Sequence, residues 1–175
     1  VAVAMAAAHS NSLLVYSGGA TSGDAGDQSE ALSYMDVAAS AGWWGCIDVA
    51  NRAHAEDFAL DSLYNMVFSI GEYARRLGKY PERLIVVGWR FKAERYLMHA
   101  RAIAWCREFI YVGINNPPET NGTLAAALSG ERQKRLALIR DPFLKAHKWE
   151  LLRESRNVYC HEEPYSEDVP AMAPF

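Results

Sequence analysis

Short apolar runs alternate with longer segments of helical periodicity along most of this chain. Buried strands are predicted where a run of four to six apolar residues is closed by turn residues: 13–16, 84–87 and 109–114. Helices are predicted where apolar positions recur every three to four residues: 30–39, 57–77 and 92–105. Strands alternating with helices at this spacing favour right-handed crossovers. We therefore predict an α/β domain with a mostly parallel sheet.

Four segments are less regular. Residues 1–8 are typical of the last turns of a helix without a start signal, so we expect the strand before them to be missing from this sequence. Residues 43–49 are assigned as a further strand, and the chain from 123 onward is polar and helical. We predict a single domain over residues 1–160 and an extended tail over 161–175.

Composition narrows the function classes. With 175 residues, 50% of them hydrophobic, the chain can bury a real core. A formal charge of -3 does not favour nucleic acid or an anionic membrane as partner, and no apolar run reaches the roughly 20 residues of a membrane span. Three scattered cysteines without a CxxC pair indicate reduced thiols, and we expect an intracellular rather than a secreted protein. No metal-ligand cluster is present in the sequence.

The first candidate site is the loop Ser17-Gly18-Gly19-Ala20-Thr21, which follows the first predicted strand. In open parallel sheets, ligands bind beyond the carboxyl ends of the strands. Two glycines let the backbone approach a ligand closely, and their N–H groups can bind an oxyanion. The alternative is a tight turn without a ligand.

The second candidate follows the strand at 84–87. Lys92 and Arg95 are three residues apart near a helix N-terminus, so they share a face. The helix dipole does not favour cations there, which implies an anionic ligand or a carboxylate partner. His99 lies one turn further and is either packed or catalytic. The alternative is a solvated basic face.

Two further polar residues belong with these loops. Glu30 opens the helix after the glycine loop and is the best available general base, although an acid in a first turn also stabilises a helix without any functional role. Asn65 stands in an otherwise apolar stripe and must find partners if it is buried.

The order of these pieces resembles the YdcF-like family, typified by YdcF, SanA and ElyC, and within it the fungal-type branch. The pieces are Ser-Gly-Gly-x-Thr, then Ser-Glu-Ala, then Glu and Asp-Ser-x-x-Asn, then Gly-Trp-x-Phe-Lys-x-x-Arg. The family's usual histidine after the later strand is replaced here by Phe91 or Lys92, whereas Arg95 is retained. The resemblance implies a Rossmann-like three-layer fold. It also implies S-adenosylmethionine or a nucleotide as a ligand, since S-adenosylmethionine binding is attached to one branch.

Two hypotheses follow, and whether the protein is an enzyme stays open between them. The first is a small-molecule-binding domain, a hydrolase or transferase acting on an anionic, nucleotide-like or phosphorylated ligand. Its catalytic residues would be Glu30 and His99, and its ligand-binding residues would be Ser17, Gly18, Gly19, Thr21, Asn65, Lys92 and Arg95. The second is a non-catalytic scaffold subunit with protein partners, favoured by the missing first strand, the replaced histidine and five tryptophans.

Overall fold

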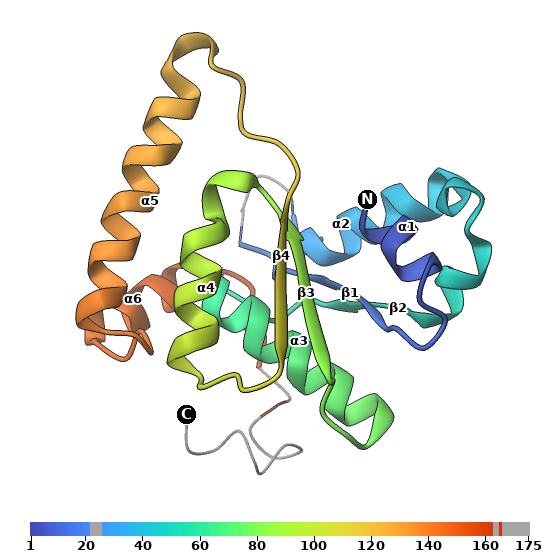
Figure 1. The fold of residues 1–175 in the computed structure, drawn as a ribbon. Helices are drawn as coiled ribbons and strands as arrows, with labels where there is room; N and C mark the ends of the chain where they lie inside the picture. The colour runs from blue at the N-terminus through green and yellow to red at the C-terminus, as the bar shows by residue number, and fades with distance from the viewer. Residues whose placement is uncertain (22–25, 163–164, 166–175) are drawn as a thin grey trace. The chain divides into compact units, whose positions relative to one another are not determined.

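The chain folds as an α/β protein with two pairs of parallel strands (Figure 1). A computed structural model describes residues 1–21, 26–162 and 165. By its internal contacts the chain forms two compact units, the first made of residues 1–80 and the chain from 147 onward, the second of residues 81–146. The sequence predicted one domain over 1–160.

The first unit is built on the pair β1 and β2, which run parallel. Leu14 lies opposite Ala53, and Ser17 lies opposite Glu56 at the last register position. Its elements are α1 (Ala2–Ala7), β1 (Leu14–Ser17), α2 (Glu30–Ser40), η2 (Gly42–Gly45), η3 (Ile47–Arg52), β2 (Ala53–Glu56), α3 (Ser62–Leu77) and α6 (His147–Arg156).

Capping residues set the bounds of the two long helices around this pair. Ser29 caps α2 by accepting the Leu32 amide at 3.1 Å. Asp61 caps α3, and Gly78 ends that helix in the left-handed conformation at φ 65°. The helix predicted from residue 57 therefore begins five residues later, because the chain before Asp61 is a loop.

Two clusters of apolar side chains form the core of the first unit. One cluster joins α1, α2, the η2–η3 segment and β2 through Val3, Ala6, Ala38, Trp43, Val49 and Ala53. A second cluster is aromatic and consists of Ala59, Phe68 and Tyr165. Each fully buried large side chain contributes about 1.5–3 kcal/mol relative to exposure.

The prediction of a strand at 43–49 is wrong. Residues 42–45 all have positive φ, at 57°, 54°, 51° and 81°, and β-strands require strongly negative φ. They form the turn η2, and η3 follows as a second short 3₁₀ segment. The second strand of the chain is instead Ala53–Glu56.

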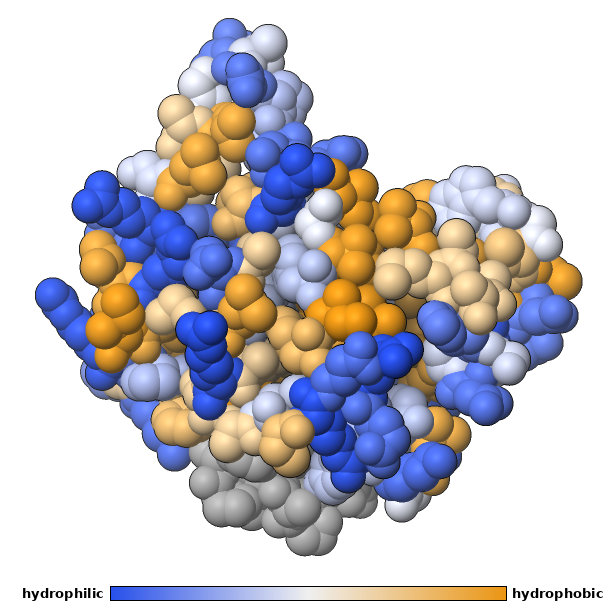
Figure 2. All heavy atoms as spheres, in the orientation of Figure 1, coloured by the Kyte–Doolittle hydropathy of each residue, from blue (hydrophilic) through white to orange (hydrophobic). Residues whose placement is uncertain are grey.

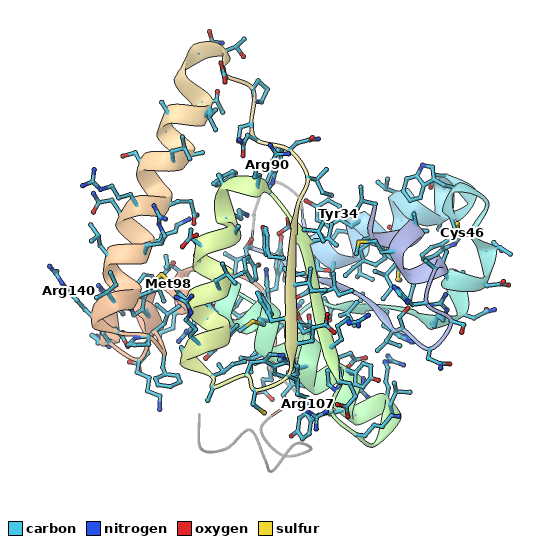
Figure 3. The ribbon with its side chains drawn as sticks, viewed as in Figure 1. Tyr34, Cys46, Arg90, Met98, Arg107 and Arg140 are labelled. Atoms are coloured by element: carbon cyan, nitrogen blue, oxygen red, sulfur yellow. The ribbon has the colours of Figure 1, made fainter. Side chains whose placement is uncertain are left out.

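The second unit contains the strands that the sequence predicted most clearly. β3 (Arg83–Gly88) pairs in parallel with β4 (Glu108–Gly113), so that Gly88 lies opposite Gly113. The Arg107 guanidinium, labelled in Figure 3, donates to the Pro81 carbonyl at 3.0 Å and ties the starts of the two strands together.

The helical elements of the second unit are η4 (Arg90–Lys92), α4 (Ala93–Ala102), η5 (Thr120–Gly122) and α5 (Thr123–Arg140). The helix predicted at 92–105 is thus confirmed as α4, and the helical character predicted after residue 123 is confirmed as α5. Along α5, exposed Leu128, Leu136 and Ile139 are interspersed with charged side chains (Figure 2).

Two sequence expectations concern the ends of the chain. The opening residues form the helix α1, as predicted. The predicted tail lies mostly outside the described residues, although Tyr165 is described and is buried against Phe68. Within the described ranges, no helix combines the length and the apolar character that crossing a bilayer requires.

Candidate functional site

A buried carboxyl and a serine hydroxyl meet at the carboxyl ends of β1 and β2. Glu56 is only 1% exposed, and its Oε2 accepts a hydrogen bond from Ser17 Oγ. Its Oε1 accepts the amides of Phe58 at 2.9 Å and Ala59 at 3.1 Å. The carboxyl is therefore held by donors from two segments that are far apart in sequence.

The environment of Glu56 changes its affinity for a proton. Burial raises the pKa of this carboxyl to about 7, and the nearby Asp57 raises it slightly. The bonds from Ser17, Phe58 and Ala59 favour the ionised form and oppose that rise. Glu56 thus has both protonation states available near neutral pH, as a general acid or base requires.

The Ser17 hydroxyl connects Glu56 to the backbone of α3. Its Oγ lies 3.3 Å from the Asn65 carbonyl, which also accepts from Ser69 Oγ at 2.6 Å. A hydroxyl carries one proton, so an ionised Glu56 takes that proton in its hydrogen bond. A protonated Glu56 instead donates to Ser17, whose own proton then turns to Asn65. The chain of polar groups fits either state of the carboxyl.

Backbone hydrogen bonds occupy the two glycines of the loop after β1. The amides of Gly18 and Gly19 donate to the carbonyls of Glu56 at 2.9 Å and Ala59 at 2.8 Å. The two glycine carbonyls accept the amides of Ala31 and Glu30. The amides of Gly18 and Gly19, which were predicted as donors to an oxyanion, therefore donate to backbone carbonyls of the protein itself.

Glu30 stands beside this loop at the start of α2. It is exposed, and its Oε1 accepts from the hydroxyl of Tyr34, labelled in Figure 3, at 3.0 Å. Asn65 joins the site through its backbone carbonyl, whereas the sequence analysis had singled out its side-chain amide. Thr21 is exposed at the end of the described part of the loop. The structure therefore brings Ser17, Gly18, Glu30 and the Asn65 backbone into one edge of the first unit.

The predicted basic residues belong to the second unit. Arg95 Nη2 forms an ion pair with Glu131 Oε1 at 3.1 Å, and both side chains are buried. Lys134 Nζ lies 3.6 Å from the same oxygen. The sequence implied either an anionic ligand or a carboxylate partner for this basic pair, and Glu131 is a carboxylate partner of Arg95.

The other two predicted residues of the second unit differ in exposure. Lys92 is half-buried, with its ammonium 5.9 Å from the centre of the Phe91 ring. His99 is fully buried, and its ring packs edge-on against Tyr96 at 6.0 Å between centroids. Its burial supports the packed alternative over a catalytic role.

Glu56 was not among the predicted site residues. The helix predicted over 57–77 would leave Glu56 as an acid at a helix start, where it needs no function. In the structure the helix α3 begins only at Ser62, and Glu56 is the last residue of β2. An acid at the end of a second parallel strand lies beside the loop that follows the first, but the stretch from Ala53 to Glu56 has no apolar run that predicts this strand.

Comparisons with known proteins add one relative. The chain is 30% identical over 124 residues to the uncharacterised protein YOR238W of Saccharomyces cerevisiae. The match covers 65% of this chain and 41% of the yeast protein, so this chain spans less than half of that relative's length. No protein-family description matches the chain. No solved structure matches it either.

Proposed function

We propose that this protein is a hydrolase or group-transfer enzyme for a small nucleotide-like or phosphorylated molecule. The observation that carries the proposal is the pairing of Ser17 with a buried Glu56 at the carboxyl ends of two parallel strands. Ligands of open parallel sheets bind at this edge. A carboxyl with a pKa of about 7 beside a half-buried hydroxyl is suited to proton transfer.

In the proposed step, Glu56 acts as the general base on Ser17. The Ser17 proton moves to Glu56 Oε2 while Oγ forms a bond to the electrophilic centre of the ligand, and the leaving group departs with its electron pair. Transfer of the bound group from Oγ to water gives hydrolysis, and transfer to another acceptor gives group transfer. The proton on Glu56 passes to the leaving group, so that Glu56 can next take a proton from the attacking water or acceptor and return it to Ser17 Oγ as the bound group is released.

The surroundings of the pair favour a hydroxyl-bearing part of the ligand at this edge. The first amides of α2 are bonded to the carbonyls of Gly18 and Gly19, so they do not present donors to a phosphate. The exposed Glu30 carboxylate accepts hydroxyl groups, as acidic residues do for a ribose. S-adenosylmethionine remains a candidate ligand of this edge. Within the second unit taken by itself, Lys92 remains a proposed contact for an anionic group.

We also propose that the chain is a YdcF-like protein with a Rossmann-like three-layer domain. The order of Ser17-Gly18-Gly19, Glu30, Asn65 and Arg95 along the chain supports this proposal, as do the two parallel strand pairs.

The test uses a thermal-shift panel of nucleotides, S-adenosylmethionine and phosphate esters on the full chain. We expect one of these probes to raise the Tm by about 5–10 °C at a concentration near 100 Kd. The stabilising compound is then incubated with the protein, and its products are followed by NMR. Ser17→Ala and Glu56→Gln should slow turnover at least about 100-fold, whereas the exposed control Glu119→Gln should not. Turnover by Glu56→Gln at the wild-type rate would refute the proposed base.

The scaffold hypothesis is the second candidate. It is favoured by the buried Arg95–Glu131 pair and by the engaged amides of Gly18 and Gly19, which leave those groups with structural roles. A panel without any stabilising ligand, together with a stable complex isolated with a partner protein, would favour this candidate.

A further inference from the structure

The helix α6 is fastened to the loop that follows β2, residues 57–61. Arg153 Nε donates to Asp61 Oδ2 at 2.8 Å, and both side chains are mostly buried. Arg156 Nη1 donates to the Leu60 carbonyl at 2.7 Å. Two consecutive loop residues are therefore bound by two arginines one turn apart.

Asp61 extends this attachment to α3. While Oδ2 takes Arg153, its other oxygen accepts the amides of Leu63 and Tyr64 at 2.9 Å each. The Arg153 guanidinium also lies over the Tyr64 ring, 4.0 Å from its centre. A carboxylate at a helix N-terminus with a charged partner is a strong anchor, because both charge-assisted bonds and the helix dipole favour it.

The opposite side of the same loop faces the candidate site. The amides of Phe58 and Ala59 donate to Glu56 Oε1, and the Ala59 carbonyl accepts the Gly19 amide. A loop of five residues bound at Leu60 and Asp61 has little freedom to rotate its amides at 58 and 59. The position of those amides is therefore coupled to the attachment of α6.

We propose that Arg153 and Arg156 are positioning residues for the Ser17–Glu56 pair: by holding the loop 57–61, they keep two backbone amides directed at the Glu56 carboxyl. This inference rests on the proposed function and deepens it. The two arginines act through the loop. The chain after α6 adds to the same attachment, since Tyr165 packs edge-on against Phe58 at 6.2 Å.

The experiment compares the full-length wild type with Arg153→Gln, Arg156→Gln and the conservative Arg153→Lys. Arg140→Gln is the matched control, because Arg140 is an exposed arginine at the end of α5 (Figure 3). Amide hydrogen exchange is measured by NMR, and the titration of Glu56 is followed through its side-chain ¹³C carboxyl signal. Arg156→Gln removes a single hydrogen bond and keeps the test usable if Arg153→Gln does not fold.

We expect the Phe58 and Ala59 amides to exchange at least tenfold faster in both glutamine variants than in the Arg140→Gln control. The Glu56 titration midpoint should rise by at least half a pH unit from about 7, because the two amides that favour the ionised carboxyl are then no longer held against it. Arg153→Lys, which keeps the positive charge, should show smaller changes in both amide exchange and the Glu56 midpoint.

Three results would overturn the proposal. The first is unchanged exchange at Phe58 and Ala59. The second is a uniform acceleration of every amide of the first unit, which is global destabilisation. The third is faster local exchange with an unchanged Glu56 midpoint, which is a purely structural role. The proposed function fails separately, through a Glu56→Gln variant that keeps full turnover while these exchange and titration results stand.

Discussion

Gly18 and Glu30 are in close contact across the turn that joins β1 to α2. A Cβ built on Gly18 would lie 3.0 Å from Glu30 Oε2 and 3.1 Å from Glu30 Cβ. Gly18 also has a φ of 149°, which side chains rarely adopt. The contact explains why this turn requires glycine without invoking a ligand, and it places the Glu30 carboxylate directly over the loop.

Replacing Gly18 by alanine should destabilise the protein by about 1–3 kcal/mol, because the new methyl group meets Glu30 and the backbone conformation is strained. Gly130 is the matched control: it lies within α5, and a Cβ there meets open space. Gly130→Ala should therefore stabilise by about 0.5–1 kcal/mol. Urea denaturation measures both, and equal effects of the two substitutions would contradict the assigned strain.

Glu56 should make the stability of the protein depend on pH. Its pKa is about 7 in the folded chain, against an ordinary value of 4.5, so the folded state binds more protons between these two values. The stabilisation is complete below pH 4.5 and is lost as the pH rises through 7. A difference of this size corresponds to about 3 kcal/mol.

Glu56→Gln removes this dependence, because glutamine imitates the protonated acid and keeps an acceptor for the Phe58 and Ala59 amides. The difference in unfolding free energy between variant and wild type should move by about 3 kcal/mol in favour of the variant from pH 4.5 to pH 8. Denaturation curves at several pH values measure it, with the exposed Glu119→Gln as control. Parallel curves for Glu56→Gln and the wild type would show that the carboxyl titrates at an ordinary pH.

Three strands and most helices could be predicted because their apolar residues follow the period of the element. β2 could not, since Ala53 to Glu56 is an Ala-His-Ala-Glu stretch without an apolar run and becomes a strand by pairing with β1. The helix after it was predicted to start too early, because Phe58 and Leu60 fit the periodicity of α3 although Asp61 caps it.

The site was predicted in its position more than in its contacts. A loop after a first parallel strand is visible in the residues from Ser17 to Thr21. The partner of Ser17 could not be predicted. Glu56 lies 39 residues away in sequence and comes beside Ser17 only because β1 and β2 pair in this register. For Arg95, the residue type implied a negative partner, but only the packing of α4 on α5 identifies that partner as Glu131.

The buried pair of Arg95 and Glu131 should be strongly coupled. Removing one partner leaves an uncompensated buried charge, so Arg95→Met or Glu131→Leu alone should cost about 3–5 kcal/mol. The double variant should cost clearly less than the two added together, because both charges are then gone. A double-mutant cycle from chemical denaturation measures the coupling. Additive costs would show that the ion pair does not stabilise the packing of α4 against α5.

The adjacent tryptophans of η2 share one backbone conformation and differ in burial. Trp43 and Trp44 have φ values of 54° and 51°, but Trp43 is 7% exposed within the core cluster and Trp44 is 62% exposed. Glycine relieves the conformational strain at either position, which is about 1–2 kcal/mol for a left-handed residue. Trp43→Gly should still lose about 3–5 kcal/mol of packing, whereas Trp44→Gly should stay within about 1 kcal/mol of the wild type. Thermal and urea unfolding of both variants measure this contrast, and a loss in Trp44→Gly as large as that in Trp43→Gly would mean that Trp44 carries packing of its own.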